Sequence, residues 1–176
     1  MPVISFLLIC ALIGAPGRSW TSPQEAKSPN PEALTEVDLR MRGVGLDARY
    51  STVLRKFGKP RRMVKERILD DTCSAPHTTL TLKYDGLTVR LDGDIRGRNF
   101  RVVSFEVTSR KWLVAPGVRI GMAENEARTR LGGPWKVTDE SGLRVVRYVT
   151  PGNDGVVALS FRNGTLFKIY WGFTLC

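Results

Sequence analysis

The sequence predicts an α+β fold. In it, two tandem repeats, each a short helix followed by antiparallel strands, form a curved sheet with the helices packed on one face. Three observations lead to this prediction. Hydrophobic residues make up 42% of the 176 residues, which is enough for a packed core. Two segments correspond without gaps at an offset of 74 positions, as from Gly43 to Gly117. In each segment, stretches that alternate apolar and polar residues follow a stretch with helical spacing.

Residues 1–19 have the features of a secretory signal peptide. Residues 3–14 are apolar except for Ser5, and this run is shorter than the roughly 20 apolar residues that cross a bilayer. We expect cleavage near Ser19 and export to the periplasm or the medium; the alternative is a buried N-terminal strand or helix. Residues 20–35 contain three prolines and few apolar residues, and are expected to form a disordered linker.

The cysteines fit an exported protein. Cys10 would leave with the signal peptide, so the mature chain keeps Cys73 and Cys176. In an oxidising compartment these two can form one disulfide, which would stabilise the fold by about 4–5 kcal/mol because it closes a long loop. The alternative is two unrelated buried thiols.

The two repeats are expected at residues 36–110 and 111–176. In both, the helical stretch ends at a Gly-x-Pro sequence, residues 58–60 in the first copy and 132–134 in the second. Glycine suits the left-handed cap of a helix and proline prevents its continuation. The two copies therefore place a helix end at corresponding positions.

The strands of the first repeat are expected at residues 80–84, 87–91 and 100–107. The first two flank Asp85-Gly86. A two-residue type I′ turn there would put all apolar side chains on one face. The register then pairs Tyr84 with Leu87, Leu82 with Val89, and Leu80 with Leu91.

The strands of the second repeat are expected near residues 144–149, 156–161 and 165–173. Asn163-Gly164 favours a two-residue turn, but that turn would pair Leu159 with Lys168. A three-residue loop over residues 162–164, with a left-handed Gly164, pairs Leu159 with Phe167 instead. The alternation of apolar residues therefore predicts the longer loop.

Residues 117–134, GVRIGMAENEARTRLGGP, resemble the signature of the SmpA/OmlA outer-membrane lipoprotein domains. Two such units in an exported chain of this size are similar to the β-lactamase-inhibitor-protein-like (BLIP-like) fold. The resemblance covers most of residues 39–173. It implies a curved antiparallel sheet backed by helices, no catalytic site, and an open sheet face that binds a protein partner.

The chain also departs from these families. Asp47 stands where a glycine is expected at the start of the first helix, and Cys10 follows the large Ile9, which does not suit a lipid-accepting cysteine. The disulfides of the inhibitor proteins lie within each repeat, whereas Cys73 and Cys176 would link the two copies. Inhibition of β-lactamases is therefore not implied by the fold.

Catalytic and metal-binding residues are scarce. His77 is the single histidine, and a nucleophilic Cys–His pair would require Cys73 as a free thiolate. The acidic residues of segment 92–94 are too few, and Arg96 lies too close, for a calcium loop. We therefore expect no enzyme activity, no metal, no cofactor and no small-molecule substrate.

The positive charge points to anionic partners. The net charge is +10 and the isoelectric point is about 10.0. The densest basic run spans the end of the first helix. The alternative to a binding patch is a solvated helix end, where cations are favourable in their own right. The candidate binding residues of this run are Arg55, Lys56, Lys59, Arg61 and Arg62. A second candidate is the polar face of the sheet, for which plain solvent exposure is the alternative; its residues are Lys83, Arg90, Arg147, Lys168 and Tyr170.

Together these features predict a non-enzymatic exported module that binds an acidic protein or an anionic envelope component through a cationic sheet face. A cytoplasmic nucleic-acid-binding protein is the main alternative, but single strands are usually stacked on aromatic residues and only Tyr170 qualifies. An enzyme using Cys73 and His77 and an envelope structural protein are further alternatives.

Overall fold

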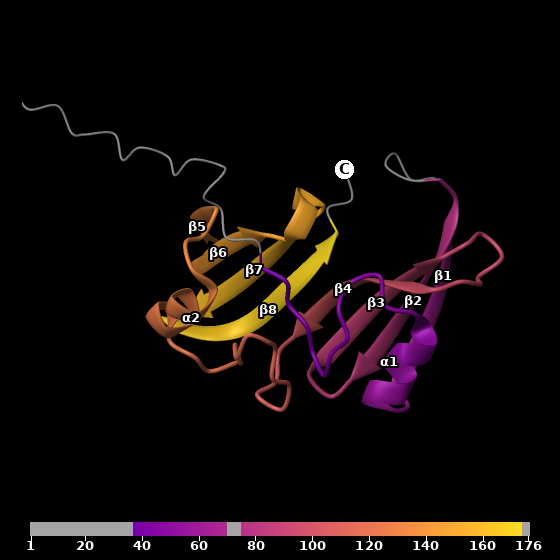
Figure 1. Cartoon of the computed structure of the whole chain (residues 1–176), viewed down its shortest axis with the longest axis horizontal. Coiled ribbons are helices and arrows are strands. Elements are labelled where there is room, and N and C mark those ends of the chain that lie inside the picture. The colour runs from indigo at the N-terminus through magenta and orange to yellow at the C-terminus, as the bar shows by residue number, and fades with distance from the viewer. Residues whose placement is uncertain (1–36, 70–74, 174–176) are drawn as a thin grey trace, which may run out of the picture.

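A computed structural model describes residues 37–69 and 75–173 of the chain as two short helices and eight strands (Figure 1). A three-residue 3₁₀ turn, Pro151–Asn153, joins β6 to β7. In chain order the elements are α1 (Tyr50–Phe57), β1 (Arg62–Ile68), β2 (His77–Tyr84), β3 (Leu87–Gly93), β4 (Arg101–Val107), α2 (Glu124–Leu131), β5 (Lys136–Glu140), β6 (Leu143–Val149), β7 (Gly155–Arg162) and β8 (Thr165–Phe173).

All eight strands belong to one antiparallel sheet with the order β1-β2-β3-β4-β8-β7-β6-β5. The join between its two halves is the pairing of β4 with β8, from Ser104 opposite Gly172 to Val107 opposite Ile169. The predicted α+β class, with two tandem helix-plus-strand repeats, is therefore wrong. The chain is mainly β and builds one continuous sheet.

The helices are too small to define the fold class. Each has eight residues, and α1 buries only Val53 while α2 buries only Ala127 and Leu131. Most of the apolar core comes from the strands. The prediction also missed β1 and β5, because both are edge strands whose residues are mostly exposed and charged, so they lack the alternation that marks a half-buried strand.

Local turn chemistry was predicted with more success. Both helices end at the expected glycines, Gly58 and Gly132, which have φ of 80° and 85°. Their ψ values of −164° and −159° are extended, so the predicted left-handed conformation of these caps is wrong. The β2–β3 hairpin has the predicted register, with Leu82 opposite Val89. A type I′ turn requires a positive φ at both of its central residues. Gly86 has a positive φ but Asp85 does not, so this turn is not type I′.

The β7–β8 hairpin differs from the prediction. Asn163 and Gly164 form a two-residue turn with φ of 50° and 72°, so Arg162 lies opposite Thr165. The register then shifts between Ser160 and Phe161, which brings Leu159 opposite Ile169. The predicted three-residue loop is wrong because a bulge in the strand, rather than a longer loop, restores the apolar register.

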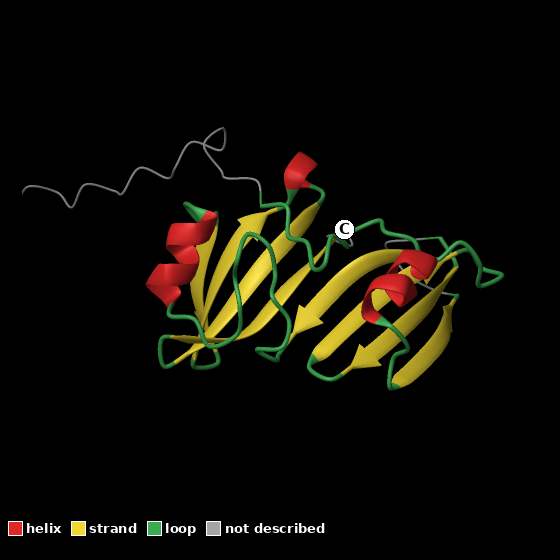
Figure 2. Ribbon diagram, turned by 60° about the horizontal axis from the view of Figure 1, so that its bottom comes forward, coloured by secondary structure: helices red, strands yellow, loops and turns green. Residues whose placement is uncertain are grey.

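One face of the sheet is covered and the other is open. Both helices and the longer connections lie over the same face (Figure 2). The segment 37–48 crosses it between the helices and buries Met41 and Val44, and the connection from β4 to α2 buries Val114 and Val118. The predicted boundary between residues 110 and 111 falls in this connection and stays a prediction.

A fully buried tryptophan lies where the two halves of the sheet meet. Trp171 on β8 is 1% exposed and stacks on Phe105 of β4, with ring centres 4.5 Å apart and planes 17° from parallel. These two residues are also directly paired across the strands. The stack therefore belongs to the core of both halves.

Two phenols, one buried (Tyr148) and one half-buried (Tyr84), make stability depend on alkaline pH. Burial, and secondly Tyr50, raises the pKa of Tyr84 to about 12; burial also raises the pKa of Tyr148 to about 12. Between about pH 10 and 12 the unfolded chain loses phenolic protons that the folded chain keeps, so the free energy of unfolding falls as pH rises.

We expect denaturant unfolding to show a lower midpoint at about pH 11 than at about pH 9. The double variant Tyr84→Phe/Tyr148→Phe should lose much of this decline. The Tyr148 hydroxyl has no hydrogen-bond partner in the described part of the chain, whereas the Tyr84 hydroxyl donates a 3.1 Å hydrogen bond to the carbonyl oxygen of Gly58. The double variant therefore starts from a lower stability, and the quantity to compare is the change between the two pH values. An equal decline in the variant and the parent would assign the effect to other groups.

Candidate binding face

The uncovered side of the sheet is a polar surface, which we call the open face. Directly opposite residues of neighbouring strands share a face, so the strand registers define its members. Its longest row crosses all eight strands in spatial order: Arg62, Lys83, Thr88, Glu106, Tyr170, Ala158, Arg147 and Lys136. The structure thus places the predicted Lys83, Arg90, Arg147, Lys168 and Tyr170 on this face.

The basic residues of the open face differ in whether a carboxylate neutralises them. Arg62 and Lys83 stand directly opposite each other on β1 and β2, and both side chains are exposed. Among the described residues, neither has a carboxylate oxygen within ion-pair distance. Like charges directly opposite on two strands are destabilising, so this pair keeps its full positive potential at a cost in stability.

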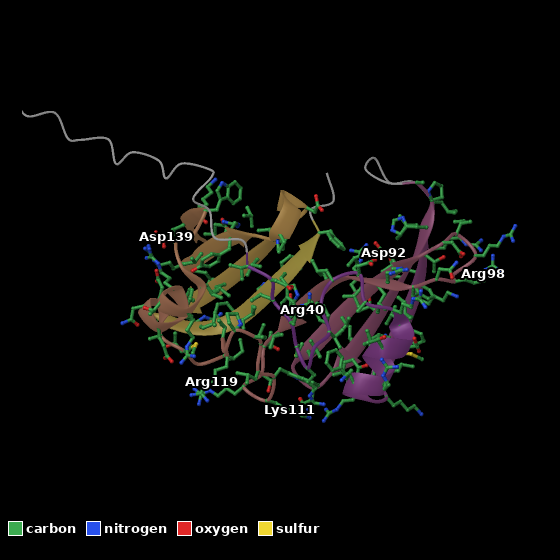
Figure 3. The ribbon with its side chains drawn as sticks, in the orientation of Figure 1. Arg40, Asp92, Arg98, Lys111, Arg119 and Asp139 are labelled. Carbon is green, nitrogen blue, oxygen red and sulfur yellow. The ribbon has the colours of Figure 1, made fainter. Side chains whose placement is uncertain are left out.

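Arg90 belongs to a polar cluster instead. Its guanidinium Nε is 3.7 Å from Oδ1 of Asp92, and Thr79 donates a hydrogen bond of 2.9 Å to the same carboxylate. The Nε2 atom of His77 is 3.8 Å from Oδ2 of Asp92, so the Asp92 carboxylate lies close to both Arg90 and His77 (Asp92 is labelled in Figure 3). Arg90 therefore has a carboxylate within ion-pair distance, unlike Arg62 and Lys83.

Arg147 and Lys168 are also paired. Arg147 contacts Glu140 at 2.8 Å and donates a 2.7 Å hydrogen bond to Thr138. Hydrogen bonds from Thr138, then Arg147, hold the pKa of Glu140 below its usual value. Lys168 lies 3.9 Å from Glu106. This half of the face is therefore closer to neutral than its count of basic residues predicts.

The basic run around the first helix does not form one patch. Arg55 and Lys56 lie in the last turn of α1, on the covered side of the sheet, and Lys59 lies in the connection to β1. Arg61 is 3.7 Å from Asp85. Only Arg62 reaches the open face, because the chain has by then entered a strand that the sequence pattern did not reveal.

Tyr170 lies along the sheet. A Cβ atom on Gly172 would be 2.7 Å from the Tyr170 hydroxyl and 2.7 Å from Cβ of Ser104. The phenol therefore extends over the neighbouring glycine, where a side chain would collide with it. Lys136, opposite Arg147, is a basic member of the open face that sequence reasoning missed; recognising β5 as a strand would have revealed it.

Several predicted features lie outside the described residues. These are the signal peptide, the linker and both cysteines of the predicted disulfide, Cys73 and Cys176. His77 has its Nδ1 3.0 Å from the carbonyl oxygen of Ala75. Residues 37–69 and 75–173 contain no cluster of three or more His, Cys, Asp or Glu side chains that could hold a metal ion. Within the same residues, neither helix has the length and hydrophobicity needed to cross a membrane.

Comparisons by sequence find no match among models of protein families and none among curated proteins. The resemblance of residues 117–134 to SmpA/OmlA domains therefore stays a prediction.

Solved structures similar to this chain include proteins of bacterial origin. A cysteine-rich secretory protein of Staphylococcus aureus is 14% identical over 81% of this chain and 49% of its own, with a TM-score of 0.49. An extracellular protein of Bacillus anthracis that contains an SCP domain is 13% identical over 90% of this chain and 50% of its own, with a TM-score of 0.45. The chain thus spans about half the length of these two proteins.

A candidate β-lactamase inhibitor protein of Streptococcus mutans is also similar, with 15% identity over 76% of this chain and 85% of its own and a TM-score of 0.27. What the open face binds is therefore argued from its own residues.

Proposed function

We propose that this protein is a non-enzymatic exported module that binds an acidic protein through the β1–β3 end of its open face. The observation that carries the proposal is the exposed pair Arg62 and Lys83, which no described carboxylate neutralises. The repulsion between these two cations destabilises the free protein. An anionic group that binds between them would relieve this repulsion.

The β1–β3 end of the open face suits an acidic partner better than the opposite end does. Arg147 and Lys168 already have carboxylate partners, and Arg90 shares Asp92 with His77. An acidic partner would have to displace these ion pairs, whereas it meets Arg62 and Lys83 without competition. Exposed cations without a carboxylate partner contribute both to the association rate and to the choice of partner.

Export and the lack of enzyme activity rest on the sequence. The apolar run at residues 3–14 and the two cysteines left after its removal support an oxidising destination. The intact mass of protein from its native host, with and without reduction, tests whether residues 1–19 are removed and whether the two remaining cysteines are oxidised. A chain that retains residues 1–19 and has free thiols would contradict export.

The binding test measures the affinity of the folded protein for poly-L-glutamate at low and at physiological salt. The double variant Arg62→Glu/Lys83→Glu should bind about tenfold more weakly and with less salt dependence. The matched control is Lys111→Glu/Arg119→Glu, which changes the net charge equally. Both control residues lie in the connection from β4 to α2, at the margin of the molecule (Figure 3).

Equal weakening in the two double variants would reduce the interaction to net charge and overturn the proposed face. Tight binding of phosphatidylglycerol vesicles or of single-stranded DNA, with no binding of poly-L-glutamate, would overturn the proposed partner class.

A further inference from the structure

We infer that an extended segment of the acidic partner adds as a ninth strand to the outer edge of β1 and inserts an apolar side chain into a pocket between α1 and β1. The inference takes the acidic partner from the proposed function and adds the mode of binding. Three features of the described structure support it: an open strand edge, an apolar pocket beside that edge, and basic side chains along it.

The edge of β1 is available for pairing. β1 is the terminal strand of the sheet, and all seven of its residues pair with β2 on one side only. In the described part of the chain no strand lies on its other side. Alternate residues of an edge strand direct their backbone N–H and C=O groups away from the sheet, where an added strand can hydrogen-bond to them.

The pocket lies at the start of this edge. It has a volume of about 420 Å³, and the residues that line it include the apolar Tyr50, Leu54, Pro60 and Met63. Met63 is a large apolar side chain left 53% exposed, and its Sδ accepts a hydrogen bond of 3.6 Å from the Tyr50 hydroxyl. An apolar residue of a bound strand would cover Met63 and fill the space against α1.

The side chains of β1 select the charge of the added strand. Met63, Lys65 and Arg67 alternate on the covered side of the sheet, and Arg62 lies on the open face. Charged edge residues oppose pairing with a second copy of the same strand, since like charges would then face each other. They favour a strand that places an apolar residue beside Met63 and carboxylates beside Lys65 and Arg67.

An added strand that continues the antiparallel pairing of the sheet meets Arg67 first and Met63 last. The expected ligand is therefore an extended segment with two acidic residues at a two-residue interval, followed two residues later by an apolar residue. A capped peptide of sequence Ser-Glu-Ser-Glu-Ser-Leu has this pattern. A capped peptide of the same composition, Ser-Ser-Ser-Glu-Glu-Leu, has the same charge but cannot present all three side chains on one face of a strand. Affinities of the two peptides for the full mature protein separate strand addition from attraction by charge.

We expect the alternating peptide to bind about tenfold more tightly than the isomer and to slow amide hydrogen exchange in residues 62–68. Met63→Ala should remove most of this difference. Leu113→Ala is the matched control, because Leu113 is 61% exposed and lies in the distant connection from β4 to α2. Both substitutions are at exposed sites, so both variants should fold.

The outcomes distinguish this inference from the proposed function. Equal binding of the two peptides, weakened by Arg62→Glu/Lys83→Glu but without protection of β1 amides, would overturn strand addition and keep the acidic partner. No binding of either peptide or of poly-L-glutamate would overturn both. Preferential binding of the alternating peptide that Met63→Ala leaves unchanged would overturn the role of the pocket.

Discussion

Replacing Trp171 by alanine is expected to lower the free energy of unfolding by about 3–5 kcal/mol, the range for removing a large aromatic side chain from a core. Trp171 is 1% exposed and stacks on Phe105 at the β4–β8 join. Its loss opens a cavity at the pairing that connects the two halves of the sheet. Because domains have a net stability of only about 5–15 kcal/mol, this single change removes a large share of it.

Denaturant unfolding followed by circular dichroism checks the prediction. Trp135→Ala is the control, because Trp135 is 51% exposed and its removal should change stability by less than about 0.5 kcal/mol. Trp171→Phe should recover much of the loss, since it keeps a ring against Phe105, and the Trp171 indole N–H has no hydrogen-bond partner among the described residues. Similar midpoints for the two tryptophan-to-alanine variants would show that the stack does not hold the halves together.

The second large effect is expected from a single methyl group. In Gly155→Ala, the added Cβ collides with the backbone carbonyl oxygen of Gly172 and lies 2.9 Å from Oγ1 of Thr150. A flexible side chain could move aside, but the backbone of Gly172 is paired with β7 on one side and with β4 on the other, so its carbonyl cannot move without disturbing both pairings. We expect a loss of about 1–3 kcal/mol, typical of overpacking.

Gly133→Ala is the matched control for this substitution. A Cβ at Gly133 meets no atom within 4 Å. Thermal unfolding of both variants compares the same chemical change in crowded and in open surroundings. If Gly155→Ala melts at the temperature of Gly133→Ala, the close approach of β7 and β8 at this point is not as tight as the structure indicates.

Sequence reasoning could predict which residues lie on the open face, but not which of their charges are neutralised. Alternation along each strand assigned Lys83, Arg90, Arg147 and Lys168 to one face, and the registers place them there. Their carboxylate partners come from other positions and strands, such as Glu140 for Arg147 and Glu106 for Lys168. Only the folded chain shows which cations remain unpaired.

The sequence alone determined the features that depend on a few neighbouring residues: the glycine ends of α1 and α2, and the register of the β2–β3 hairpin. Tertiary structure decided that β4 pairs with β8, that a bulge adjusts β7, and that the polar segments β1 and β5 complete the sheet. The physical reason is that turn geometry and alternation are local. Strand partners far apart in the chain, and edge strands with no apolar face of their own, are selected by packing and backbone hydrogen bonding of the whole sheet.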